Sequence, residues 1–269
     1  MLSVPSLLLR SVLFRYNKWG YLVAAQMSVS HDDAEHVAKD WGILENYAYT
    51  IINVRQVNDY KLIHIRNPWG IKQWQGPWSD SAREWELKEN QGVVDALGYV
   101  IRDDGTFWMA YADFVKQFNK LYVTRIFPQH YDFHTIKEGW DGPTCGGPPT
   151  CSTWCANPQY RLAVEEPKDG KPAKTFISLL QRDNRAASSS IAERVKGLGF
   201  TVVQCRGAGR CRLWQCVPEQ VVAVAGPAKS REVCSSVRLE PGGKYMVVPH
   251  CDRGVEGSFV LRCVKSICC

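Results

Sequence analysis

Apolar residues near the start of the chain recur at the spacing of a helix face. Leu8, Leu9, Val12 and Leu13 repeat at intervals of three and four residues, which predicts an amphipathic helix. The first sixteen residues also contain two arginines and no acidic residue, as a transit peptide does. We interpret the segment as a helix of the fold.

Two segments rich in β-branched and aromatic residues come next. They run from Tyr47 to Val54 and from Lys61 to Arg66. Asn58 and Asp59 lie between them, and both residue types favour turns. The pattern predicts two strands joined as a hairpin.

The segment from Phe107 to Tyr122 changes its period along its length. It begins as a strand and reads as a helix from Ala112 onward. Asp103-Asp104-Gly105 before it predicts a turn. Further upstream, tryptophans among Gly and Pro predict an aromatic loop region, and the first half therefore reads as α+β. The residues of the predicted helix face are Phe114, Val115, Phe118 and Leu121, and the loop tryptophans are Trp69, Trp74, Trp78 and Trp85.

Short strand-like runs dominate the second half of the chain. Residues 139–150 hold four Gly and three Pro, which predicts a loop or linker. Several short strands in series after it predict an antiparallel β-sandwich. The runs are YRLAVEE, TFISLLQR, FTVVQC, VVAVA, KYMVVP and SFVLRC.

Charge and cysteine separate the two halves. The 269 residues carry a net charge of +6, and residues 1–128 hold as many acidic as basic side chains, so the excess falls in residues 129–269. All eleven cysteines lie at or after Cys145. We therefore expect two domains, 1–128 and 129–269. No apolar stretch of about 18 residues predicts a transmembrane helix, and no nucleic-acid motif accompanies the modest basic excess.

Several motifs together resemble a known family. The segments GILENYAYTI, LIHIRNPWG, QGPWSD and DDGTFWMAYADF are similar to the second lobe of a calpain catalytic core. The segments NPQYRLAVEEP, LQRD, REVCSS and LEPGGKYMVVP resemble the β-sandwich that follows that core. The resemblance implies an α+β half of a papain-like cysteine protease core followed by an antiparallel β-sandwich. It also implies the calcium-dependent cysteine endopeptidases, which use a Cys–His–Asn constellation.

This chain departs from the family at its catalytic residues. The first lobe with its nucleophilic Cys has no counterpart, because no cysteine precedes Cys145. The family's Gly-His-Ala-Tyr tetrad reads Asn46-Tyr47-Ala48-Tyr49, so Tyr47 stands at the histidine position. A phenol, with an ordinary pKa of about 10, keeps its proton at neutral pH and cannot act as the base. The resemblance identifies Asn67 as the orienting Asn and Trp69 as the Trp that covers the pair.

We therefore expect a chain without peptidase activity. The alternative is a non-catalytic binding or regulatory module that acts on a calpain partner or an acidic membrane surface. His64 is not a substitute base, because strand alternation places it on a different face from Asn67. His31 and His36 read as surface residues.

The resemblance also implies a calcium site on this lobe. Its positions are Gln73, Asp80, Arg102 through its carbonyl, Asp104 and Thr106. The family has Glu at positions 73 and 106, so this chain lacks two of the negative charges. Calcium takes six to eight oxygen ligands and is sensitive to their charge. We expect a weak calcium site or a metal-free turn.

The cysteines do not have the spacing of a zinc site. An odd number without a clear signal peptide favours free thiols and a cytoplasmic location. The terminal pair Cys268-Cys269 could accept a prenyl group and give peripheral membrane attachment, although we favour a tail without that role.

Overall fold

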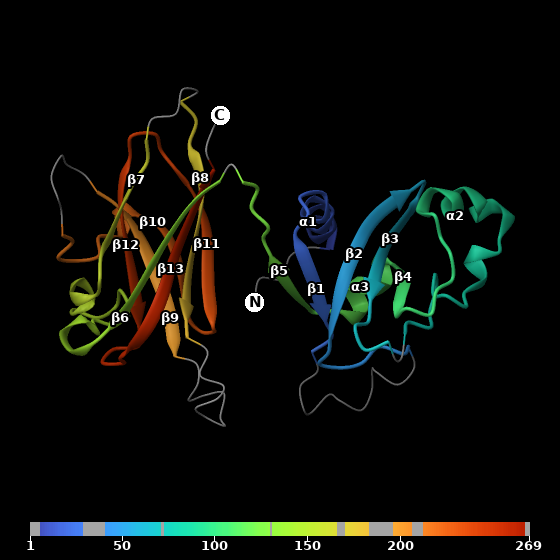
Figure 1. Cartoon of the computed structure of the whole chain (residues 1–269), viewed down its shortest axis with the longest axis horizontal. Coiled ribbons are helices and arrows are strands. Elements are labelled where there is room, and N and C mark those ends of the chain that lie inside the picture. Colours follow the sequence, from blue (N-terminus) through green and yellow to red (C-terminus); the bar gives the residue numbers. More distant parts are fainter. Residues whose placement is uncertain are drawn as a thin grey trace. The chain divides into compact units, whose positions relative to one another are not determined.

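The computed structural model describes residues 6–28, 41–70, 73–129, 131–165, 170–182, 196–205 and 212–266. His31, His36 and the Cys268-Cys269 pair lie outside these residues. The chain forms two compact units, Met1–Phe127 and Pro128–Cys269 (Figure 1). Among the described residues, no helix has the length and apolarity that a membrane crossing requires.

The first unit is a five-stranded antiparallel sheet with short helices. The sheet order is β4-β3-β2-β1-β5. Its strands are β1 (Leu22–Gln26), β2 (Ala48–Val57), β3 (Tyr60–Arg66), β4 (Thr106–Ala110) and β5 (Lys120–Thr124), and its helices are α1 (Ser6–Lys18), α2 (Gln91–Leu97) and α3 (Tyr111–Gln117).

The predicted helix and hairpin are confirmed. In α1, Leu13 is buried and Leu9 packs beside it against the sheet core. β2 and β3 pair from Thr50↔Arg66 to Val57↔Tyr60. Asn58 in the turn has a φ of 51°, a left-handed conformation that Asn tolerates better than most residues.

The predicted helix from Ala112 to Tyr122 is wrong in its second half. The helix α3 ends at Gln117, and Leu121 belongs to β5, where it pairs with Ala25 of β1. Phe118 is buried in the core of the sheet and does not extend the helix. Pairing with a strand almost a hundred residues upstream decides the conformation here, and helical periodicity carries no information about that pairing.

The second unit is a sandwich of two four-stranded antiparallel sheets. One has the order β10-β9-β12-β7 and the other β11-β8-β13-β6. The strands are β6 (Tyr131–Trp140), β7 (Tyr160–Ala163), β8 (Ala173–Gln181), β9 (Gly197–Gln204), β10 (Val221–Lys229), β11 (Glu232–Leu239), β12 (Lys244–Cys251) and β13 (Gly257–Ser266). The predicted sandwich is confirmed, although β6 and β11 were not among the predicted strands.

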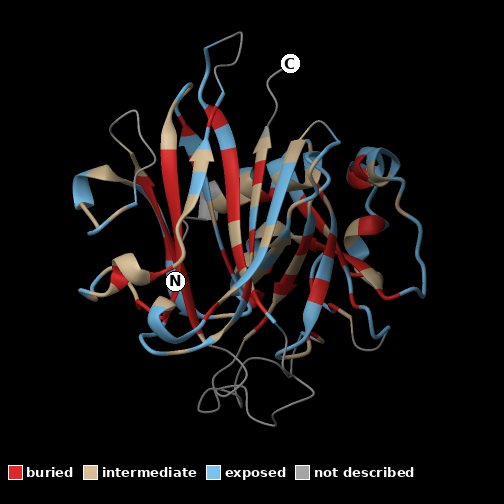
Figure 2. Cartoon of the chain, turned by 60° about the vertical axis from the view of Figure 1, so that its left-hand side comes forward, coloured by how far each residue is buried: buried red, intermediate tan, exposed pale blue. Residues whose placement is uncertain are grey.

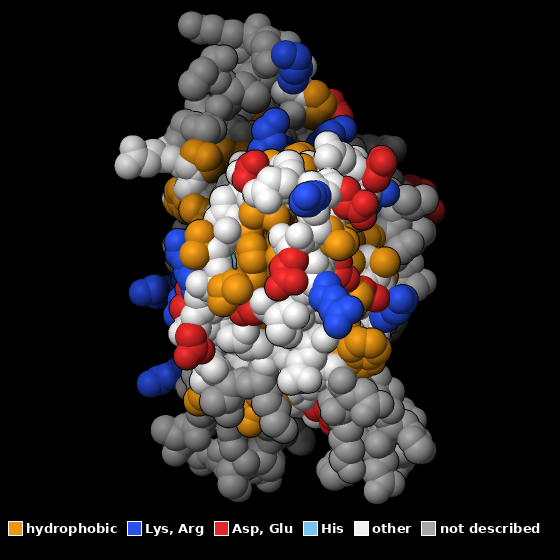
Figure 3. Space-filling model, turned by 90° about the vertical axis from the view of Figure 1, so that its right-hand side faces the viewer, with side chains coloured by type: hydrophobic (Ala, Val, Ile, Leu, Met, Phe, Trp, Pro, Cys, Tyr) orange, Lys and Arg blue, Asp and Glu red, His pale blue; other side chains and the backbone are white. Residues whose placement is uncertain are grey.

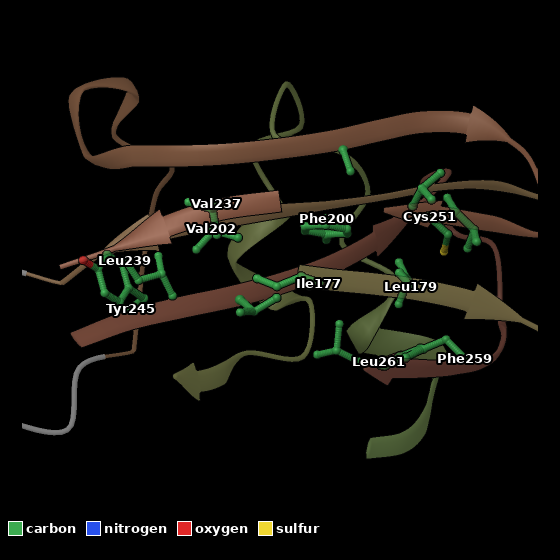
Figure 4. Close-up of a cluster of buried hydrophobic side chains, with 14 of the residues drawn as sticks. Ile177, Leu179, Phe200, Val202, Val237, Leu239, Tyr245, Cys251, Phe259 and Leu261 are labelled. Atoms are coloured by element: carbon green, nitrogen blue, oxygen red, sulfur yellow. The ribbon is translucent and has the colours of Figure 1, made fainter. Parts of the chain in front are cut away.

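The core of the sandwich lies between its two sheets. The side chains of Ile177 and Leu179, at alternate positions of β8, lie in the same buried cluster as Phe200 and Val202 of β9 (Figure 4). Buried residues follow the strands, while the outer loops are exposed (Figure 2). This alternation is what the period of a half-buried strand requires.

The Gly- and Pro-rich segment 139–150 is not a linker between the units. Trp140 ends β6, and the segment that follows it packs within the second unit. Trp154, further along the same connection, is buried against Val203 and Met246 on the outer face of the β9–β12 sheet. The connection thus covers a second apolar face of the sandwich.

Candidate functional site

Tyr47 and Asn67 lie at the same end of the β2–β3 hairpin. Tyr47 directly precedes β2 and Asn67 directly follows β3, and Thr50 pairs with Arg66 at that end of the hairpin. Asn67 is buried, whereas Tyr47 is 45% exposed and Trp69 is 65% exposed. The rings of Tyr47 and Trp69 meet edge to face, with centroids 6.0 Å apart. The structure thus places at one end of the hairpin the three residues that the resemblance assigns to the His, Asn and Trp positions.

Asn67 holds the turn that leaves β3. Its side-chain Oδ1 accepts a hydrogen bond from the Trp69 amide at 3.0 Å. Its own amide donates to the Gly105 carbonyl at 2.8 Å, and its carbonyl accepts from the Gly70 amide at 3.2 Å. These bonds join the RNPWG turn to the Asp103-Asp104-Gly105 turn. Asn67 therefore stabilises the local fold whether or not a histidine lies beside it.

Replacing Gly105 by alanine is expected to destabilise this junction. Gly105 has a φ of +78°, and a Cβ there would lie 2.6 Å from the Asn67 carbonyl oxygen. The left-handed backbone alone costs an alanine about 1 kcal/mol, and the backbone clash raises the expected loss to about 2–4 kcal/mol in the free energy of unfolding. Urea unfolding followed by tryptophan fluorescence measures this loss.

Gly98→Ala is the matched control for that substitution. Gly98 also has a positive φ, +59°, but an added Cβ would meet no atom within 4 Å. Its expected cost is therefore the backbone term alone, about 1 kcal/mol. Equal losses for Gly105→Ala and Gly98→Ala would contradict the close approach of Gly105 to Asn67.

His64 lies on the other face of β3. Its ring stacks on Trp108 at a centroid distance of 4.6 Å and an interplanar angle of 6°. Leu62 on the same face packs against Trp78 and Trp108, whereas Ile63 and Ile65 enter the core beside α1. Burial lowers the pKa of His64, and the Asp104 carboxylate acts in the opposite direction. The alternation expected from the sequence is confirmed.

Four of the five predicted calcium positions line one cavity of about 410 Å³. These are Asp80, Arg102, Asp104 and Thr106, while Gln73 is not among the residues that line it. The structure adds residues that sequence reasoning missed there, among them Arg66 and Tyr99. Arg66 could have been anticipated, because strand alternation puts it on the face of His64.

The charges in this cavity are mixed. Asp104 Oδ1 accepts hydrogen bonds from the Thr106 amide at 3.0 Å and from the Thr106 hydroxyl at 2.6 Å. These bonds, together with the nearby Arg102 and Arg66 guanidinium groups, lower the pKa of Asp104. Burial raises the pKa of Asp80, while a hydrogen bond from Tyr99 opposes the rise. Burial and the Asp80 carboxylate raise the pKa of Tyr99 to about 12.

This donor set fits calcium poorly. Only two carboxylates, those of Asp80 and Asp104, line the cavity. The Asp104 carboxylate already accepts hydrogen bonds from Thr106, and the cationic side chains of Arg66 and Arg102 lie near it. Within the described part of the chain, no three His, Cys, Asp or Glu residues gather as a metal site would need. Figure 3 shows the face on the right-hand side of Figure 1, where acidic and basic side chains are interspersed.

The cysteines regroup in space. Cys145 and Cys251 are both buried in the main core of the sandwich. A second group packs around Trp154 on the outer face of the β9–β12 sheet and contains Cys155, Cys205 and Cys216. Cys145, Cys151, Cys155, Cys216, Cys251 and Cys263 are free thiols. In the sequence, the cysteines form two runs, Cys145-Cys151-Cys155 and Cys205-Cys211-Cys216. The structure places Cys145 and Cys155 of the first run in different clusters, whereas Cys205 and Cys216 of the second share one. Cys211 lies outside the described residues.

Comparison with known proteins gives the same two parts. The model of the family "Calpain family cysteine protease" matches residues 3–125, and that of "Calpain large subunit, domain III" matches residues 136–264. The Calpain-type cysteine protease ADL1 of Oryza sativa subsp. japonica is 34% identical over 264 residues, covering 93% of this chain and 12% of the relative.

Two further relatives agree. The Calpain-type cysteine protease DEK1 of Arabidopsis thaliana is 32% identical over 93% of this chain and 12% of the relative. Calpain-9 of Mus musculus is 32% identical over 93% of this chain and 39% of its own length. The chain thus spans less than half the length of each of these relatives. With both family models matched in succession and relatives 32–34% identical over 93% of this chain, the chain belongs to the calpain family.

Proposed function

We propose that this chain is a calpain-family protein whose second-lobe site performs no peptide hydrolysis. The observation that supports the proposal is Tyr47 at the histidine position, beside Trp69 and at the same end of the hairpin as Asn67. Cysteine peptidases need a base that takes the thiol proton and returns it to the leaving amine. A phenol does not exchange its proton in that way near neutral pH.

The Tyr47→His substitution tests the proposal. We expect neither the 269-residue chain nor the Tyr47→His variant to cleave a fluorogenic peptide in the presence of calcium, because these residues include no cysteine upstream of the site to act as nucleophile. Purified calpain under the same conditions is the positive control. Turnover by either protein above that of a denatured sample would overturn the proposal.

For calcium we infer weak affinity at most. The two carboxylates Asp80 and Asp104 and the adjacent Arg66 and Arg102 support this inference, since calcium affinity follows ligand number and charge. No step of the proposed function depends on the ion.

A second candidate function is a binding or regulatory module. Trp69 and Tyr47 are largely exposed, and exposed aromatic side chains are enriched at protein interfaces. The partner in this proposal is a complementary catalytic lobe, because these residues stand at the positions that face one in the family. The test is binding of this chain to an isolated first catalytic lobe of a calpain. Weaker binding by the Trp69→Ala variant would favour this role, and unchanged binding would contradict it. A cytoplasmic location and attachment to acidic lipid stay predictions.

A further inference from the structure

A second cavity of the first unit lies at the opposite end of the hairpin from Tyr47. It has a volume of about 730 Å³ and lies between α1 and the last rungs of β2 and β3. Val54, which lines it, is seven residues beyond Tyr47, or roughly 20 Å along a strand. This α1–hairpin cavity is therefore separate from the candidate site, and its size is that of a small-molecule pocket.

The cavity has an apolar floor made by local patterning. Val54 and Ile63 are opposite each other in the β2–β3 register, and both are buried. On the helix side, Phe14 contributes a ring that is 49% exposed. Leu9 and Leu13 occupy the core face of α1, so residues 10, 11, 14 and 15 form the adjacent stripe that faces the cavity.

The rim of the cavity is cationic. Arg10 and Arg15 come from that stripe, and Lys61 stands opposite Gln56 on the last rungs of the hairpin. Arg55 also lines the cavity, although strand alternation directs its side chain with Leu62 to the other face. No aspartate or glutamate is among the described residues that line it.

These cations have no acidic partner within the described part of the chain. The Arg10 guanidinium donates to Gln56 Oε1 at 3.2 Å, and Arg15 Nε donates to the Ser11 carbonyl at 3.3 Å. Both acceptors are neutral, so the positive charge around the cavity is not compensated. Guanidinium groups match carboxylate and phosphate oxygens in geometry.

We propose that the α1–hairpin cavity binds a small amphipathic anion, with an apolar body on Val54, Ile63 and Phe14 and an anionic head between Arg10, Arg15 and Lys61. A concave cavity encloses a single ligand, whereas a membrane surface would require a flat or convex basic face. The uncompensated rim selects the sign of the head group, and the apolar floor supplies the affinity for the body.

Titration of the 269-residue chain with three probes of one chain length tests the proposal. We expect saturable binding of decanoate by isothermal titration calorimetry, at least tenfold weaker binding of decanol, and no binding of decylammonium. The affinity for decanoate should fall as salt concentration rises. Decyl phosphate distinguishes the two head groups: tighter binding than decanoate assigns phosphate, and weaker binding assigns carboxylate. Equal affinity for decanoate, decanol and decylammonium would overturn the proposal. So would the absence of saturable decanoate binding.

Variants locate the binding. The double variant Arg10→Gln/Arg15→Gln is expected to weaken decanoate binding at least tenfold, while Arg10→Lys/Arg15→Lys retains most of it. Arg83→Gln/Lys88→Gln removes two exposed cations of the same unit away from the cavity and should leave the affinity unchanged. An unchanged thermal unfolding midpoint shows that each variant is folded. Binding that the first pair of substitutions does not weaken would refute the location.

Discussion

Replacing His250 by leucine is expected to make the protein more resistant to acid. His250 lies in β12 opposite Gly199 of β9, and its side chain is 0% exposed. Neither ring nitrogen has a hydrogen-bond partner within the described residues. A Cβ at Gly199 would be 2.3 Å from His250 Cε1, so the imidazole packs directly over that glycine.

Burial lowers the pKa of His250 from 6.5 to about 4, although the Asp252 carboxylate acts to raise it. Because the pKa in the folded state is below that of the unfolded chain, the folded protein binds fewer protons between these values. The stability that comes from keeping the His250 imidazole neutral is therefore present in full above pH 6.5. It is lost as the pH falls toward 4. At 1.36 kcal/mol per pKa unit the loss is about 3 kcal/mol.

The His250→Leu variant has no such group. At pH 7 we expect its free energy of unfolding to be within about 1 kcal/mol of that of the parent. The leucine and histidine side chains have similar volumes, and the substitution removes the two ring nitrogens that lack hydrogen-bond partners. At pH 4 we expect it to gain about 3 kcal/mol relative to the parent. Urea unfolding at pH values between 4 and 7 measures the difference.

His134→Leu is the control for this experiment. His134 is an exposed residue of β6 in the same unit, so water reaches its imidazole in both the folded and the unfolded chain. We expect His250→Leu to gain more unfolding free energy relative to the parent than this exposed-site variant does when the pH is lowered from 7 to 4. A pH-independent difference for His250→Leu would show that the buried histidine does not limit stability in acid.

Phe200→Ala is expected to cost about 3–5 kcal/mol of unfolding free energy, the range for a fully buried phenylalanine. Phe200 is 0% exposed and stands between the two sheets with Ile177 and Leu179 (Figure 4). It pairs with both Ala225 and Pro249 as part of a central strand. Its removal leaves a cavity that rigid strands on both sides cannot close.

Phe133→Ala removes the same side chain from the surface of the same unit. Phe133 of β6 is 58% exposed, so we expect a loss below about 1 kcal/mol. Chemical denaturation followed by circular dichroism compares the two variants. Similar losses would mean that Phe200 is not at the centre of the sandwich core.

Proximity of Tyr47 to Asn67 could be predicted because both flank strands of one short hairpin. Local periodicity determines the strands, and the turn residues Asn58 and Asp59 determine the connection. The same alternation correctly placed His64 away from Asn67. The expected absence of a base at position 47 rests on residue identity alone, so it is a prediction that needs no structure.

The calcium region shows where such reasoning stops. Asp104 and Thr106 were predicted as ligands, but their mutual hydrogen bonds and the cations beside them depend on how β3 and the following loops pack. Gln73 was expected with them and does not line the cavity. A list of oxygen-bearing residues does not determine which other charges share their cavity.

The sequence by itself determined the family and the two-part organisation into α+β and β-sandwich segments, and it predicts that Tyr47 stands at the histidine position. Only the tertiary structure decided where α3 ends, which cysteines are neighbours, and that His250 lies over Gly199. It also decided that Arg10 and Arg15 share a cavity with Lys61, about fifty residues away. The physical reason is that periodicity reports which face of one element is apolar, whereas these features arise from pairing between distant segments, which is selected by packing of the whole core.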